Sequence, residues 1–157
     1  MKPKLYIETS VVSYLTGRPS RDMLVATHQQ VTREWWERRR PEFEVFASQL
    51  VATEAGGGDE DAAKRRLDVL RDLPYLVLTS EAMSLGREFV RRGPVPAEAA
   101  DDALHIALAT MHGMDYLLTW NCAHIANAEM RYALSEVCLS LGHDLPVICT
   151  PEELLEE

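Results

Sequence analysis

Five short apolar runs, spaced along the whole chain, are the feature that most limits what this sequence can fold into. They are apolar throughout rather than alternating, which is typical of strands that are buried on both faces of a parallel sheet. The runs are Leu5–Ile7, Val45–Phe46, Leu76–Leu78, Tyr116–Leu118 and Val147–Cys149. Longer segments separate them, as the crossover connections of a parallel sheet require.

The intervening segments show the apolar periodicity of amphipathic helices. The stripes are Ala63, Leu67 and Leu70; Ala82, Leu85 and Phe89; and Met130, Ala133, Leu134, Val137, Cys138 and Leu141. Gly93 is well placed to end the second of these helices. Strands that alternate with helices predict a layered α/β domain.

Composition limits the class of protein further. The chain has 157 residues, of which 46% are hydrophobic and 26% are charged, and this predicts one globular domain spanning residues 1–157. Because no apolar run approaches the ~20 residues that cross a bilayer, we expect no membrane association. The apolar run that leads up to Glu8 has only three residues, so we expect no signal peptide. The odd number of widely spaced cysteines fits neither a disulfide framework nor a zinc site, which favours a reducing cytoplasm: Cys122, Cys138 and Cys149.

The net charge of −9 counts against non-specific coating of nucleic acid. Four of the charges lie in an acidic C-terminal tail, residues 152–157, and without it the balance is −5. Two groups of arginines interrupt the acidic background, and we favour solvated helix faces for both: Arg33, Arg38, Arg39 and Arg40 beside Trp35 and Trp36, and Arg87, Arg91 and Arg92. The tryptophans could stack on single-stranded RNA, or pack in a core or a dimer seam with the stripe Leu24, Val31 and Trp35.

The segment from Glu98 to His112 has almost no polar face, which predicts a helix buried on most sides. Asp102 and His105 lie three residues apart in it and therefore share a face. A buried carboxylate needs a partner, a metal or a helix N-terminus. For His105, we favour a packed core histidine that donates to backbone over a catalytic base.

Polar side chains follow the predicted strands at the point where each strand ends. Glu8-Thr9-Ser10 follows the first strand, Thr119-Trp120-Asn121 follows the fourth, and Glu54 lies six residues beyond Ser48 at the end of the second. Ligands bind beyond the carboxyl ends of the strands in open α/β sheets. Glu8, Glu54, Asp102 and Asn121 could therefore meet at one edge. Each also has a local alternative, as a helix N-terminal charge, a surface residue or a cap.

Together these segments resemble the PIN-domain nucleases, the family that includes the VapC-type toxins of toxin–antitoxin pairs. The resemblance covers nearly the whole chain. It rests on Tyr6-Ile7-Glu8-Thr9-Ser10, on Leu50-Val51-Ala52-Thr53-Glu54, on Asp102-Ala103-Leu104-His105-Ile106-Ala107 and on Tyr116-Leu117-Leu118-Thr119-Trp120-Asn121. It implies a three-layer α/β/α PIN-like domain with a central, mostly parallel five-stranded sheet.

The resemblance also implies catalytic positions. The acidic positions of the family fall on Glu8, Glu54 and Asp102, which are expected to bind metal, and on Asn121, which is expected to assist. Thr9 and Thr119 match hydroxyl positions that orient waters or carboxylates. Asp101 ranks lower than Asp102, because the family pattern places Ala-Leu-His directly after the key aspartate.

Three neighbouring carboxylates repel one another, and a hard cation relieves this repulsion. Oxygen ligands suit Mg²⁺ or Mn²⁺ as the cofactor. The implied function is a metal-dependent endoribonuclease, the toxin of a toxin–antitoxin pair, with RNA as substrate, a small antitoxin as partner and a homodimer as assembly. Glu8 stands where the family has aspartate, and Asn121 lacks a charge. These departures keep an alternative open, a catalytically weak PIN-fold module that binds RNA or a protein.

Overall fold

A five-stranded, wholly parallel sheet forms the centre of the molecule. The computed structural model describes residues 1–155. The strands lie in the order β3-β2-β1-β4-β5, with β1 in the middle. Their bounds are Lys4–Ile7 for β1, Glu44–Ser48 for β2, Tyr75–Leu76 for β3, Tyr116–Leu118 for β4 and Val147–Cys149 for β5. Each predicted apolar run thus contributes to a strand. On β1, Tyr6 pairs with Phe46 on one side and Leu117 on the other.

Within residues 1–155, seven α-helices connect the strands. They are α1 (Thr9–Thr16), α2 (Met23–Arg38), α3 (Gln49–Ala55), α4 (Glu60–Leu70), α5 (Ser80–Arg91), α6 (Ala100–Met111) and α7 (Ala128–Ser140). Most begin at a side chain that accepts a hydrogen bond from the free N–H groups of the first turn, as Ser48, Asp59 and Thr79 do. The helix stop predicted at Gly93 is present, and this glycine has a φ of 97° just after α5.

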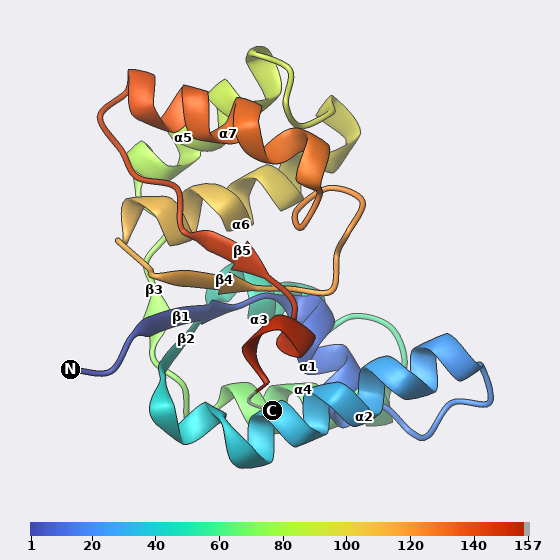
Figure 1. Ribbon diagram of the computed structural model, residues 1–157. Coiled ribbons are helices and arrows are strands. Elements are labelled where there is room, and N and C mark those ends of the chain that lie inside the picture. Colours follow the sequence, from blue (N-terminus) through green and yellow to red (C-terminus); the bar gives the residue numbers. More distant parts are fainter. Residues whose placement is uncertain (156–157) are drawn as a thin grey trace.

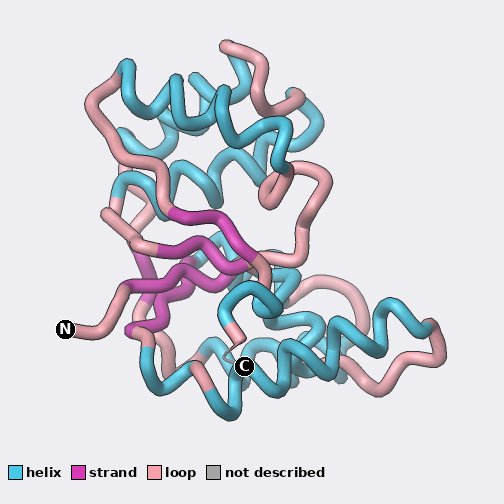
Figure 2. Tube along the Cα trace, viewed as in Figure 1, coloured by secondary structure: helices cyan, strands magenta, loops and turns pink. Residues whose placement is uncertain are grey.

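The strand order decides which face each helix covers. From β1 the chain moves outward through β2 to β3, then crosses back to β4 and continues to β5 on the other side. Since crossovers between parallel strands are right-handed, reversing the direction of travel moves the helices to the opposite face. Helices α1 to α4 accordingly gather on one face, and α5, α6 and α7 on the other (Figure 1). The tube view shows the strands between these two layers (Figure 2). The predicted three-layer α/β/α fold is confirmed.

Burial of the strands on both faces holds for the centre of the sheet and fails at its edges. Leu5, Tyr6 and Ile7 of β1 are fully buried. Val147, in the edge strand β5, is exposed, and so are the last two residues of the third apolar run, which lie beyond the end of β3. An edge strand has a neighbour on one side only, so its ends are less completely covered.

The aromatic and arginine-rich part of α2 is mostly structural. Trp35 is fully buried, which favours the core interpretation over RNA stacking for this residue. The Arg40 guanidinium lies 4.3 Å from the ring centroid of Trp36. Arg33 donates to the carbonyl of Gly17 at 2.6 Å and so satisfies a backbone group just beyond α1. Leu24 is exposed, contrary to the stripe predicted with Val31 and Trp35, because it lies in the first turn of the helix.

The start of the predicted acidic tail is ordered. Residues Pro151–Leu154 form a 3-10 helix that packs against α2. Its Glu153 carboxylate accepts a hydrogen bond from the Thr150 backbone N–H at 2.8 Å. Residues 156 and 157, at the end of the tail, lie outside the described residues. None of the helices in residues 1–155 has the length and apolar character needed to cross a bilayer.

Candidate functional site

The reversal of strand order falls between β1 and β4, and the predicted polar residues gather at the carboxyl ends of these strands. The Glu8 backbone N–H donates to the Leu118 carbonyl at 3.0 Å, so the two strand ends lie side by side. The Thr119 N–H extends the ladder to the Cys149 carbonyl at 3.0 Å. An order reversal leaves a crevice between the first helices on either face, which is the usual ligand site of such sheets.

Glu8 is held firmly at this edge. It is the N-cap of α1, and its Oε2 accepts from the Ser10 backbone N–H at 3.1 Å. Its Oε1 accepts from the hydroxyls of Ser10 and Thr119, each at 2.5 Å. The side chain is only 5% exposed. The N-terminus of α1 carries a partial positive charge, which further stabilises this buried carboxylate.

The same two hydroxyls also hold the turn that follows β4. Ser10 Oγ accepts from the Trp120 backbone N–H at 2.8 Å, and Thr119 Oγ1 accepts from the Asn121 backbone N–H at 2.9 Å. Each hydroxyl therefore accepts one hydrogen bond from the turn and donates one to Glu8. The local sequences after β1 and β4 are thus joined into one hydrogen-bonded unit.

Glu54 reaches the site from the last turn of α3. Its Oε1 accepts from Thr9 Oγ1 at 2.5 Å and lies 2.6 Å from Nε2 of His105. Within the described residues, its Oε2 has no hydrogen-bond partner, and the side chain is 30% exposed. Partial burial raises the pKa of Glu54, but the hydrogen bond and the charge of His105, helped by Thr9, outweigh this and leave the pKa below its ordinary value.

His105 lies in α6 and is completely buried. Its Nδ1 lies 2.8 Å from the hydroxyl of Tyr6, which in turn lies 2.7 Å from Oγ of Ser48. The expectation that this histidine donates to backbone is wrong, since both ring nitrogens face side chains. Burial, together with the charges of Glu8 and Glu54, raises the pKa of Tyr6 despite its bond to Ser48, so the phenol keeps its proton.

Glu8, Glu54 and His105 form a close group, in which one ligand atom from each lies within 4.8 Å of the others. Both nitrogens of His105 are already engaged, whereas Glu54 Oε2 is unbonded within the described residues and Glu8 Oε2 has a single 3.1 Å bond. The oxygens are therefore the available ligands. In each carboxylate, one oxygen accepts two hydrogen bonds and the other can still bind a further partner. This arrangement fits a hard divalent cation.

Asp102 lies outside this close group. It is in the first turn of α6, with its Oδ2 3.4 Å from Nδ1 of His124 and a side chain 20% exposed. The neighbouring Asp101 is exposed. The side-chain oxygen of Asn121 accepts from the backbone N–H of His124 at 3.0 Å, so it caps the turn after β4. The structure thus brings Glu8 and Glu54 together and links Asp102 and Asn121 through His124.

The sequence interpretation did not assign the hydrogen bonds that three residues make within the site. They are Ser10, Tyr6 and Ser48. A signal for Tyr6 exists, because residues i and i+2 of a strand share a face, so its phenol lies on the face of Glu8 and a buried phenol needs a partner. Ser10 was noted only as a possible cap, and Ser48 only as a strand end. Nothing local distinguishes their additional bonds.

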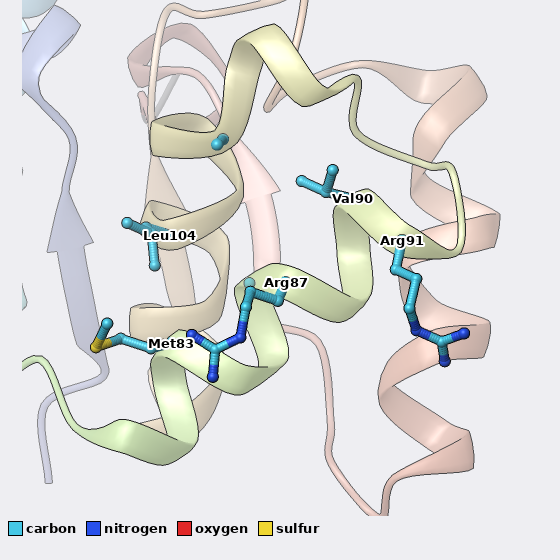
Figure 3. Close-up of a pocket in the computed structure, with 7 residues that line it drawn as sticks. Met83, Arg87, Val90, Arg91 and Leu104 are labelled. Carbon is cyan, nitrogen blue, oxygen red and sulfur yellow. The ribbon is translucent and has the colours of Figure 1, made fainter.

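A separate groove lies on the α5–α6 side of the molecule. It has a volume of about 480 Å³ and is lined by apolar residues of both helices with two arginines, including Met83, Val90 and Leu104 (Figure 3). Its lining contains no carboxylate. The arginines predicted to form a solvated face are partly paired, since Arg91 and Arg92 both contact Glu88. This groove has none of the groups that the acidic site brings together.

Comparisons with known proteins support the fold. No protein-family model and no curated protein matches the sequence. Among solved structures, the chain resembles VapC20 of Mycobacterium tuberculosis, which is described as a sarcin-ricin loop cleaving toxin. The TM-score is 0.60 at 14% sequence identity, and the match covers 82% of this chain and 94% of the toxin. The chain therefore has the fold of a VapC toxin, the group indicated by the sequence resemblance.

Proposed function

We propose that this chain is a single PIN domain, residues 1–157, that hydrolyses RNA phosphodiester bonds with the help of Mg²⁺ or Mn²⁺, as the toxin of a toxin–antitoxin pair. One observation carries the proposal. Glu8 and Glu54, 46 positions apart in the sequence, meet at the reversal of strand order, on a fold shared with an RNA-cleaving toxin. Burying a pair of carboxylates costs stability unless hydrogen bonds or a bound cation offset their charges.

The following roles are part of the proposal, and the contacts of these residues support them. Glu8 and Glu54 hold the cation through the oxygens that their neighbours leave available, and Asp102 is the third acidic group. Thr9 and Thr119 donate to these carboxylates and keep them oriented. A divalent cation held there would place positive charge beside the scissile phosphate and would lower the pKa of a nearby water. We assign Asn121 an assisting role through the turn that it caps.

Cleavage of a mixed RNA substrate with Mg²⁺, Mn²⁺ or EDTA tests the proposal. We expect EDTA to abolish cleavage, and Glu54→Gln and Asp102→Asn each to lower the rate by about 100-fold or more, since even residues that only orient ligands are worth about 10–100-fold. Asp101→Asn is the matched control, because it removes an exposed acid next to Asp102 in the same helix turn. Cleavage that survives both Glu54→Gln and Asp102→Asn would contradict the assignment.

One observation favours a second candidate, a PIN-fold module with weak activity that binds RNA or a protein. The side-chain oxygen of Asn121 is occupied by the His124 N–H, and the residue brings no negative charge. The double variant Glu8→Asp, Asn121→Asp separates the two candidates. A large gain in cleavage rate in the double variant supports an attenuated site. No gain, together with cleavage of RNA by the wild type, supports the nuclease.

The partners follow from the same proposal. We infer a small antitoxin that covers the acidic site, a homodimer, and a location in the cytoplasm. The location is supported by the cysteines, all of which are free, with Cys138 and Cys149 buried. Co-expression with the neighbouring gene products, followed by affinity purification and size-exclusion chromatography, tests both the antitoxin and the dimer.

A further inference from the structure

We propose that His105 and Tyr6 are positioning residues for Glu54, through a buried chain of hydrogen bonds that sets which Glu54 oxygen is presented to a divalent cation. The inference rests on the metal site of the proposed function. It assigns a role to buried polar side chains that the proposed cleavage does not itself use.

The chain of hydrogen bonds begins and ends in the same short helix, α3. Ser48 caps the start of α3, where its Oγ accepts from the Val51 N–H at 3.2 Å. The chain then passes to Tyr6 in β1 and to His105 in α6. It returns to α3 at Glu54, in the last turn of the helix. Three elements of the sheet and its two helical layers are thus connected to one carboxylate.

The bond from His105 to Glu54 has the same direction whatever the protonation state of the ring. An ionised carboxylate only accepts, so Nε2 of His105 donates to Glu54. In a neutral imidazole the other nitrogen, Nδ1, accepts from the Tyr6 hydroxyl, and in an imidazolium it donates to the Tyr6 oxygen, so Nε2 donates to Glu54 in either state. With a neutral ring the Tyr6 oxygen accepts from Ser48, and with a charged ring the Tyr6 hydroxyl donates to Ser48, whose oxygen also accepts from Val51. Every polar atom from Ser48 Oγ to Glu54 Oε1 has a partner, as buried polar groups require.

The chain of hydrogen bonds fixes the orientation of the Glu54 carboxylate because it holds one of the two oxygens only. His105 and Thr9 both donate to Oε1, at 2.6 and 2.5 Å. Oε2 has no partner within residues 1–155. The carboxylate cannot rotate without breaking two short bonds, one of which comes from a fully buried ring. A partner that fixes the orientation of a ligand lowers the entropy that metal binding costs.

Mn²⁺ binding measured without RNA tests the proposal, by titration calorimetry or by the electron paramagnetic resonance signal of free Mn²⁺. His105→Leu removes the donor, whereas His105→Gln places an amide N–H near the position of Nε2. Tyr6→Phe removes one hydroxyl and leaves the ring. Thr110→Val is the matched control, since Thr110 is buried in the same helix and donates to the Ile106 carbonyl away from the site.

We expect His105→Leu to raise the Kd for Mn²⁺ by about 10–100-fold, as is usual when a group that orients a metal ligand is lost. His105→Gln should recover most of the affinity, Tyr6→Phe should fall between, and Thr110→Val should match the wild type. Cleavage by His105→Leu should recover as Mn²⁺ is raised, which a loss of folded protein would not do. Should His105→Leu fail to fold, the near-isosteric Tyr6→Phe decides.

A wild-type Kd in folded His105→Leu or Tyr6→Phe overturns the proposal, and so does equal weakening in His105→Gln and His105→Leu. The outcome is separable from the fate of the nuclease proposal. If the variants follow the expected order but no RNA is cleaved with any metal, positioning stands and the nuclease function fails. If Glu54→Gln abolishes cleavage while His105→Leu binds Mn²⁺ normally, the positioning role alone fails.

Discussion

Replacing Thr119 with valine tests how strongly the candidate site is built into the fold. Thr119 is fully buried, and its hydroxyl connects two elements of the site. It donates to Glu8 Oε1 at 2.5 Å and accepts from the Asn121 backbone N–H at 2.9 Å. Valine keeps the shape of the side chain and removes both bonds, so the change isolates the hydroxyl.

The two lost hydrogen bonds set the size of the expected loss in the free energy of unfolding. A hydrogen bond to a charged group contributes about 1.5–3 kcal/mol, and an orphaned buried donor costs about 1–3 kcal/mol. Glu8 keeps its two bonds from Ser10, and Asn121 is half-buried, so water replaces part of the second loss. We therefore expect Thr119→Val to lower the free energy of unfolding by about 2–4 kcal/mol.

Urea unfolding in EDTA measures this difference, and the chain supplies the control. Thr110 is also buried, but its hydroxyl donates to the Ile106 carbonyl of its own helix and contacts the weakly bonding thiol of Cys138. Thr110→Val should therefore cost about 1 kcal/mol or less. Thr119→Ser, which keeps the hydroxyl, should restore most of the loss. Equal midpoints for the two valine variants would refute the reasoning.

Three further predictions concern the metal, pH and the thiols. Mn²⁺ at 100 times its Kd should stabilise the wild type by about 2.7 kcal/mol, which is a rise in Tm of roughly 5–11 °C in differential scanning fluorimetry. An equal rise for Glu54→Gln would contradict the site. Burial raises the pKa of Glu54 but the bond to His105 lowers it more, so the stabilisation is present above the ordinary pKa of 4.5 and is lost as the pH falls below it; in urea unfolding across pH, Glu54→Gln should lose less stability on acidification than the wild type. Burial raises the pKa of Cys138 to about 11 and of Cys149 to about 12, so Ellman's reagent at about pH 8 should label the exposed Cys122 alone in native protein, and labelling of a second thiol before unfolding would be the contrary result.

The fold follows from the sequence to the extent that burial controls it. The central strands are predicted well because Leu5, Tyr6 and Ile7 have no polar position among them, and such a run is stable only between two helical layers. The edges are predicted less well. Val77 extends the third apolar run but lies beyond β3 and is exposed, because local composition does not report how many neighbours a strand has. The strand order is likewise a property of the whole chain.

The candidate site was predictable as a location and less so as a set of contacts. The carboxyl ends of parallel strands meet at one edge, and this places Glu8 near Thr119 whatever the details. Which acids then touch depends on how α3 and α6 rotate against the sheet. Asp102 and His105 are three residues apart, yet His105 contacts Glu54 while Asp102 lies beside His124. A shared helix face does not specify a shared partner.

The two departures from the PIN pattern differ in their consequences. Glu8 is fully accommodated, because the extra methylene brings its carboxylate within 2.5 Å of the hydroxyls of Ser10 and Thr119. A shorter aspartate would have to leave those donors or move the backbone that bonds to Leu118. Asn121, by contrast, uses its oxygen to cap a turn and contributes no charge. The case for a weakened site therefore depends on Asn121, and the single variant Asn121→Asp should account for most of any gain in the double variant.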